Sequence, residues 1–183
     1  MRLVLIGFSG AGKSTVGQMV AARLGWAFFD TDDEIERAAG RRIFQIFDQE
    51  GEPGFRRWEA QAVAKAVEGD DRVIAVGGGA VVDPANRRAL KAGGLVVLLE
   101  GVVDTLLERL RADLADEPRP MLESADPRGR MAALKEAREP IYLEMADLVV
   151  STDGLSPEEV ADRVVAATGA KALRANEARR GRQ

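Results

Sequence analysis

The segment Gly7-Phe8-Ser9-Gly10-Ala11-Gly12-Lys13-Ser14-Thr15 fits GxxxxGK(S/T), the pattern of a phosphate-binding loop. It follows directly after the apolar run 3–6, and Val16, Val20 and Leu24 then recur at helical spacing. The motif therefore has the strand before it and the helix after it that its function requires. A glycine-rich turn with a chance Lys-Ser pair would leave this agreement unexplained, so we predict a nucleotide-binding loop.

The chemistry of this loop follows from its residue types. Glycines at 7, 10 and 12 permit backbone conformations that are closed to other residues, so successive N–H groups can point at phosphate oxygens where the helix begins. Lys13 is expected to reach the β- and γ-phosphates, and the Ser14 hydroxyl to bind Mg²⁺. The residues expected to bind ATP here are Gly10, Ala11, Gly12, Lys13, Ser14 and Thr15.

The composition limits the possible classes of protein. The chain has 183 residues, 46% of them hydrophobic and 31% charged, which suits one globular domain. Cysteine and histidine are both absent, which excludes disulfides, thiolate chemistry and a histidine base. Carboxylates, Lys, Arg and the lone Tyr142 remain for proton and charge transfer. We see no signal segment or membrane span and expect a cytoplasmic protein without a membrane partner.

Charge is unevenly distributed along the chain. The net charge is −4, but five basic residues and one acidic residue give residues 171–183 a charge of +4. Such a tail could contact nucleic acid, yet no aromatic residue is interleaved with the charges. We therefore expect a disordered, solvated tail at 171–183 after a single domain at 1–170, and no nucleic-acid partner.

Two carboxylates follow the second apolar run, residues 26–29. Asp30 and Asp32 are two positions apart at the end of a predicted strand, so both side chains would point to the same side. Sites in parallel α/β sheets lie beyond the carboxyl ends of the strands, which places both acids near the phosphate-binding loop. The alternative is helix capping by Asp32 or Asp33, and we assign only Asp33 to it.

The middle of the chain carries an arginine and a run of glycines. Arg56 and Glu59 are three positions apart on a predicted helix, and from the residues alone a solvated ion pair is the favoured explanation. Gly77, Gly78 and Gly79 follow the predicted strand 72–76. Three glycines increase the entropy cost of folding, so we expect a ligand against their bare N–H groups, the alternative being a flexible connector.

Residues 112–130 lack apolar periodicity and contain three prolines. Such a segment is a lid or binding loop, or else disordered. On a closing lid, Arg119 would add positive charge at the γ-phosphate and exclude water. A helix is expected to follow at 131–139 and to end at Pro140, with Arg138 as a favourable cation at its C-terminus.

Strands and helices alternate along the chain, which predicts a parallel sheet with helices on both faces. A capping box at Ser156 predicts a final helix, with Gly169 as its end. The predicted strands are 3–6, 26–29, 72–76, 95–99 and 147–151.

Seven segments in the same order and spacing resemble the shikimate kinase family: GFSGAGKST, DTDDEIE, GRRIFQIF, GEPGFRRWE, GGGAV, RPML and AREPIY. The resemblance runs over about residues 2–165. It implies an α/β protein with the three-layer α/β/α P-loop NTPase fold, a five-stranded parallel sheet, a lid at about 112–124 and a substrate-binding region. The implied reaction is transfer of the ATP γ-phosphate to the 3-hydroxyl of shikimate, with Mg²⁺ as cofactor, by a monomer.

The resemblance also implies roles for single residues. Asp32 would hold the substrate hydroxyls and take the attacking proton, and Asp30 would assist Mg²⁺ through water. The carboxylate of shikimate would be bound by two arginines, with Glu59 orienting the first. These arginines and the glycines that line the same pocket are Arg56, Arg138, Gly77, Gly78 and Gly79.

The resemblance leaves the adenine side open. Arg119 of RPML would be the lid arginine, and either Arg109 or Arg111 would contact adenine, with Arg111 our first assignment. The adenine loop usually contains an Asp-Thr pair, whereas this chain has Ser151-Thr152.

Two other classes of function remain to be compared. A kinase of the same fold for gluconate or a nucleoside would share the phosphate-binding loop but would not need FRRWE with GGG. A nucleotide-dependent switch that recruits a partner is the second, but the sequence lacks the Asn-Lys-x-Asp motif expected of a guanine-nucleotide switch.

Overall fold

The computed structural model describes residues 1–112 and 125–180, with side chains to residue 169. Five strands form one sheet in the order β2-β3-β1-β4-β5, and every pair in it is parallel. The strands are β1 (Arg2–Ile6), β2 (Ala27–Asp30), β3 (Arg72–Ala75), β4 (Gly94–Glu100) and β5 (Leu148–Ser151). The predicted sheet is confirmed, with strand bounds that differ by one or two residues.

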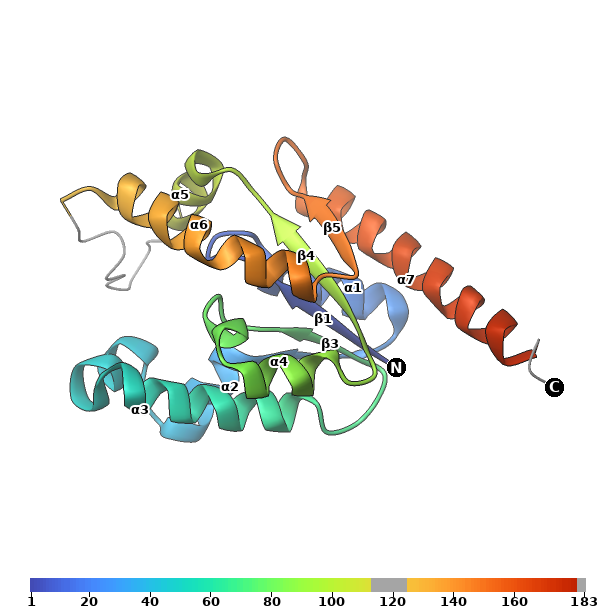
Figure 1. Cartoon of the computed structure of the whole chain (residues 1–183), viewed down its shortest axis with the longest axis horizontal. Helices are drawn as coiled ribbons and strands as arrows, with labels where there is room; N and C mark the ends of the chain where they lie inside the picture. The colour runs from blue at the N-terminus through green and yellow to red at the C-terminus, as the bar shows by residue number, and fades with distance from the viewer. Residues whose placement is uncertain (113–124, 181–183) are drawn as a thin grey trace.

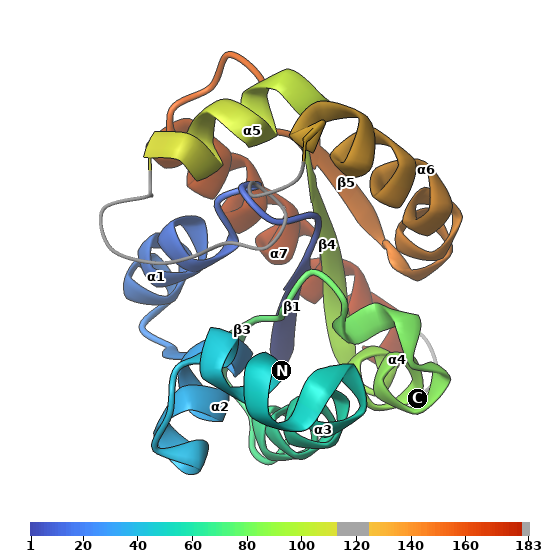
Figure 2. The same ribbon diagram turned by 90° about the vertical axis from the view of Figure 1, so that its left-hand side faces the viewer.

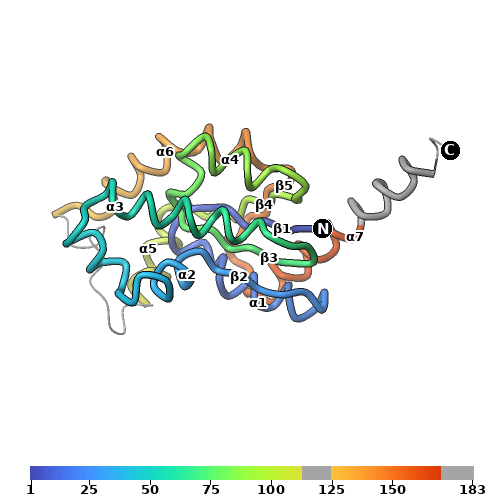
Figure 3. The backbone as a smooth tube through the Cα atoms, turned by 90° about the horizontal axis from the view of Figure 1, so that it is seen from below, coloured from blue at the N-terminus to red at the C-terminus, as the bar shows by residue number. Residues whose placement is uncertain are grey.

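Helices cover both faces of this sheet. Those described are α1 (Lys13–Leu24), α2 (Thr31–Ala39), α3 (Ile43–Ala66), α4 (Pro84–Lys91), α5 (Val103–Ala112), α6 (Pro127–Met145) and α7 (Pro157–Arg180), with a short 3₁₀ helix η1 (Ala80–Val82). Helices α3 and α4 lie along one side of the molecule and α7 along the other (Figure 1). In the view from below, α4 and α6 lie on one side of the strands and α1 on the other (Figure 3). The three-layer α/β/α prediction is confirmed.

The sheet is hydrophobic on both faces because helices cover both. Most of β1 and β4 is fully buried, and α1 packs against α7 over one face. The largest side chains that are almost completely buried in the sheet and its helices include Leu3, Leu5, Ile6, Ile74, Leu90, Leu99, Leu106, Met131 and Met145. This core fixes the strand ends from which the site is built.

Local signals from glycine and proline are overridden in three helices. Helix α3 runs through residues 50–54 despite Gly51 and Pro53, with a kink at Gly51 (φ 66°, ψ −175°). Helix α6 begins at Pro127 and not at the predicted residue 131, and it continues through Pro140, where the predicted helix ends, to Met145. Burial of Tyr142 and Met145 anchors the part beyond the proline. Helix α7 passes Gly169, since a single glycine costs only about 1 kcal/mol against alanine inside a helix.

The carboxyl ends of the strands meet at one edge of the sheet. Viewed from this edge, α2 and α3 lie on one side, and α5 and α6 on the other (Figure 2). The loop after β1 leads into α1, and the loop after β3 leads into η1. Within residues 1–112 and 125–180, no helix is long and apolar enough to cross a lipid bilayer.

Candidate active site

The loop between β1 and α1 adopts the predicted phosphate-binding geometry. Gly7, Gly10 and Gly12 all have positive φ, and Gly12 (φ 82°, ψ 20°) is the N-cap of α1. The Lys13 ammonium donates to the carbonyls of Gly7 (2.9 Å) and Phe8 (3.0 Å), so the side chain folds back over its own loop. Burial lowers the pKa of Lys13, against the opposing effect of nearby Asp32.

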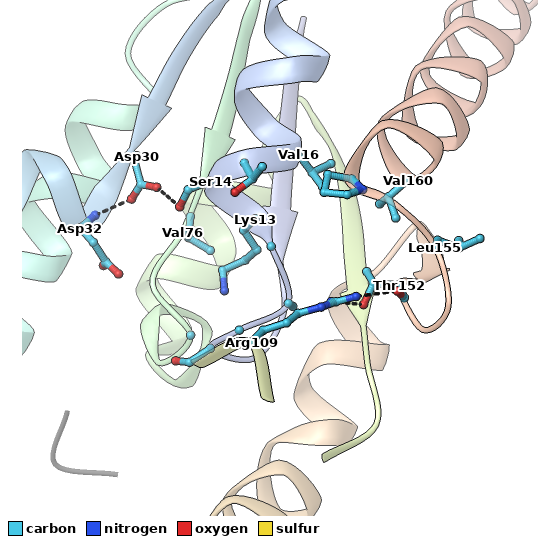
Figure 4. Close-up of a pocket in the computed structure, with 17 residues that line it drawn as sticks. Lys13, Ser14, Val16, Asp30, Asp32, Val76, Arg109, Thr152, Leu155 and Val160 are labelled. Atoms are coloured by element: carbon cyan, nitrogen blue, oxygen red, sulfur yellow. Dashed lines mark hydrogen bonds between the residues drawn. The ribbon is translucent and has the colours of Figure 1, made fainter. Parts of the chain in front are cut away.

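A cavity of about 470 Å³ opens at this loop. It is lined by Ser9, Gly10, Ala11, Gly12, Lys13, Ser14, Thr15, Val16, Asp30, Asp32, Val76, Gly78, Arg109, Thr152, Leu155, Pro157 and Val160. Figure 4 shows Lys13 between the two aspartates on one side and Arg109 on the other. The cavity therefore joins the predicted ATP-binding loop to the predicted catalytic acid.

Asp30 links the end of β2 to the phosphate-binding loop. Its Oδ2 accepts from the Ser14 hydroxyl at 2.6 Å, and its Oδ1 accepts from the Asp32 N–H at 2.9 Å. Asp30 is thus the N-cap of α2, and the assignment of that role to Asp33 is wrong because Asp33 lies inside the first turn. The described residues hold no group of three or more acidic side chains that could bind a metal. A hydroxyl and one carboxylate nevertheless fit Mg²⁺, which takes few protein oxygens alongside phosphates and water.

Asp32 lies in the first turn of α2, on the wall of the cavity. Its Oδ1 is buried and has no hydrogen-bond partner among the described residues. Burial, reinforced by the charge of Asp30, raises the pKa of Asp32 to about 7, although Lys13 opposes the rise. A β-carbon at Gly77 would lie 2.6 Å from this Oδ1, so only glycine leaves room for the carboxylate. The structure therefore holds an acid with one buried oxygen, on the wall of the cavity, whose pKa suits proton transfer near neutral pH.

Arg56, which is 30% exposed, pairs with a buried Glu59, and the sequence-based explanation of a solvated pair did not predict this burial. Glu59 is 1% exposed, and its Oε2 accepts from Arg56 at 2.7 Å. Burial raises the pKa of Glu59, and the charges of Arg56 and Arg138 oppose the rise. The opposite edge of the Arg56 guanidinium pairs with Glu52 at 2.9 Å, on the exposed surface.

The three glycines make room for the protein's own side chains. A β-carbon at Gly79 would lie 2.4 Å from the Arg56 guanidinium. The Gly77 N–H donates to the Thr31 hydroxyl at 2.9 Å, so the expectation of bare N–H groups is wrong at this position. The Gly78 carbonyl accepts from Arg138 at 3.4 Å and from the Tyr142 hydroxyl. Sequence reasoning did not predict these contacts of Thr31 and Tyr142, because only the folded chain brings the two residues to the glycine loop.

The far end of the cavity contains Arg109. Its guanidinium donates to the Thr152 hydroxyl (2.9 Å) and carbonyl (2.8 Å), so α5 is joined to the loop after β5. Arg111 is exposed and does not line the cavity, as far as the described residues show. Of the two arginines proposed for adenine, the structure brings Arg109 to the pocket. Arg119 and most of the proposed lid lie outside the described residues.

Comparison with known proteins agrees with this geometry. The sequence profile described as "Shikimate kinase" matches residues 9–168. The chain belongs to the shikimate kinase family. A shikimate kinase from Streptomyces avermitilis is 50% identical over 90% of this chain and 93% of its own length. One from Symbiobacterium thermophilum is 45% identical over 90% of this chain and 94% of its own length.

The fold of this shikimate kinase family member is also that of solved relatives. The structure titled "Shikimate kinase from Acinetobacter baumannii in complex with shikimate" superposes with a TM-score of 0.87 and 35% identity, covering 93% of each chain. The P-loop NTPase fold is therefore confirmed.

Proposed function

We propose that this chain transfers the γ-phosphate of ATP to the 3-hydroxyl of shikimate, giving shikimate 3-phosphate and ADP. The observation that carries this proposal is the position of Asp32, whose buried and unpartnered Oδ1, within the described residues, lies in the wall of the phosphate-loop cavity. One cavity thus holds a loop for the nucleotide and an acid for the acceptor hydroxyl. Membership of the shikimate kinase family identifies the acceptor.

The nucleotide would bind along the phosphate loop. Lys13 would exchange its contacts with the Gly7 and Phe8 carbonyls for the β- and γ-phosphates, because phosphate oxygens are stronger acceptors for an ammonium group. Ser14 and Asp30 would hold Mg²⁺ with the phosphates and water. When bound, this ion supplies positive charge that stabilises the transferring phosphoryl group. Arg109 is our proposal for the adenine side, in place of Arg111.

Asp32 would receive the acceptor hydroxyl. As a carboxylate it can accept a hydrogen bond from that hydroxyl, align it with the γ-phosphate and take its proton as the new bond forms. The nearby Lys13 ammonium favours the charged form of Asp32, whereas burial and Asp30 oppose it. Phosphoryl transfer has a loose transition state, so positioning and charge make up most of the catalysis.

Arg56 and Arg138 would bind the shikimate carboxylate. The inner edge of Arg56 stays with buried Glu59, while the outer edge pairs with Glu52, which is 67% exposed. Such an exposed pair contributes little, so the substrate carboxylate can replace it in a two-pronged contact. Gly77, Gly78 and Gly79 would line the same pocket. Arg119 would add charge at the γ-phosphate from the lid.

The test is ADP release from ATP and Mg²⁺ by the purified protein, with shikimate, gluconate and quinate supplied separately. We expect release that depends on shikimate alone. Release with gluconate, or ATP binding without turnover on any of the three, would contradict the proposal. We also infer that the enzyme is a cytoplasmic monomer without a nucleic-acid partner, which is checked by light scattering and cell fractionation.

A further inference from the structure

Two donors from one helix converge on one backbone oxygen at the centre of the proposed shikimate site. Arg138 and Tyr142 are four positions apart on α6, so they lie on the same face of the helix. Both donate to the carbonyl of Gly78, Arg138 at 3.4 Å and Tyr142 through a short hydrogen bond. The loop proposed to line the substrate pocket is therefore attached to the helix that carries Arg138, one of the two arginines proposed to bind the shikimate carboxylate.

The tyrosine contact is the stronger of the two. Tyr142 is 4% exposed, and burial raises its pKa to about 12, so the hydroxyl keeps its proton and remains a donor at any working pH. The Arg138 contact is at the limit of hydrogen-bond length, and its guanidinium also lies 5.7 Å from the centre of the Phe8 ring. The hydroxyl thus gives the partly buried Gly78 carbonyl its short hydrogen bond. Arg138, which also interacts with the Tyr142 oxygen, makes only a long contact with that carbonyl.

The other end of the loop is fixed independently. The hydroxyl of Thr31, which is fully buried, accepts from the Gly77 N–H at 2.9 Å. Thr31 is adjacent to Asp32, so this bond sets the loop relative to the proposed catalytic acid. Gly78 also approaches the phosphate loop, since a β-carbon there would lie 3.4 Å from the Ser9 nitrogen. The position of the Gly78 carbonyl is thus fixed by the rest of the loop, and the Arg138 side chain is the partner that can move.

We propose that Tyr142 is a positioning residue that keeps Arg138 available to shikimate by occupying the Gly78 carbonyl in its place. Without the hydroxyl, Arg138 would be the remaining side-chain donor to this partly buried oxygen among the described residues. The guanidinium would then move toward the loop and away from the substrate carboxylate. This inference rests on the proposed function, because it assumes that Arg138 binds shikimate.

The first experiment is Tyr142→Phe, which keeps the ring and removes only the hydroxyl. We expect the KM and the Kd for shikimate to rise about 10-fold, with kcat and the KM for ATP changed less than about 2-fold, as loss of one substrate contact predicts. The matched control is Thr168→Val, which removes another buried hydroxyl that bonds a helix carbonyl at 2.8 Å, far along α7. It should leave both KM values unchanged.

The second experiment is a double-mutant cycle with Arg138→Met, with shikimate binding measured by calorimetry. If the hydroxyl acts through Arg138, Tyr142→Phe should have almost no further effect on the shikimate Kd once the arginine is gone. An equal loss in both backgrounds, or an unchanged Kd in the single variant, would overturn the proposal. Equal weakening of ATP and shikimate binding would do so too, since it would indicate general damage to the fold. Wild-type enzyme that does not turn over shikimate would instead refute the proposed function, so the two failures are distinguishable.

Discussion

Replacing Asp32 with asparagine should stabilise the substrate-free enzyme at alkaline pH while removing its activity. Asp32 is partly buried, its Oδ1 is buried and has no hydrogen-bond partner among the described residues, and its pKa rises from 3.8 to about 7. The ionised form is therefore less stable in the folded protein than in the unfolded chain. A neutral amide of the same shape avoids that cost but cannot accept the substrate proton.

The magnitude follows from linkage between ionisation and folding. A pKa that is higher by roughly 3 in the folded state corresponds to about 4 kcal/mol at pH values above 7. The sign is fixed because the folded state binds more protons than the unfolded state between pH 3.8 and about 7, so stability falls as the pH rises through this window. Between about pH 5.5 and 8.5 the cost grows by about 2 kcal/mol. Both values lie above the sequence pI of 5.1.

The assay is urea unfolding of wild type and Asp32→Asn at both pH values. Relative to wild type, the free energy of unfolding of the variant should increase by about 2 kcal/mol more at pH 8.5 than at pH 5.5. Its kcat should fall at least about 100-fold. Asp104→Asn is the control, because the Arg128 partner lowers the pKa of Asp104 and both assay values lie above it. Asp104→Asn should change the free energy of unfolding by the same amount at both pH values. If Asp32→Asn also changes it equally at both pH values, the reasoning is refuted.

Three further outcomes are expected. Gly79→Ala should raise the KM for shikimate about 10-fold and leave the KM for ATP unchanged, because the new β-carbon would displace the Arg56 guanidinium. A shikimate KM equal to that of wild type would contradict this placement of Arg56. Arg119→Ala should lower kcat about 10³-fold with a modest change in shikimate affinity, and steady-state kinetics with an unchanged kcat would exclude the lid role. Gly169→Ala should raise the free energy of unfolding by about 1 kcal/mol without altering kinetics, since Gly169 lies inside α7 with open space around its α-carbon; a loss of stability would show that the helix ends there.

The sheet and the phosphate loop could be predicted because local patterns determine them. The run 3–6 before the glycine motif, and valines at helical spacing after it, specify β1 and α1 without knowledge of distant contacts. Proline gave the wrong end for α6, because packing of residues such as Met145 outweighs a local preference. Glycine gave the wrong end for α7, because one glycine costs a helix only about 1 kcal/mol.

The site itself was predictable only in part. Asp30 and Asp32 follow from their position after a strand, and the family resemblance suggested the two arginines. Burial of Glu59 did not follow from the sequence, since the spacing that joins it to Arg56 occurs equally on exposed helix surfaces. The Tyr142 contact with Gly78 joins segments far apart in the chain, and no local pattern encodes such a contact.

The central place of β1 in the sheet also bears on how the enzyme is made. Arg2 pairs with Arg72 of β3 on one side and with Gly94 of β4 on the other. During synthesis, β1 therefore leaves the ribosome before either of its neighbours, and β3, the earlier of the two, begins only at Arg72. The strand that leads into the phosphate-binding loop thus gains its partners through contacts between residues distant in the sequence, which slow folding. A nucleotide bound to the finished loop would then stabilise the folded sheet.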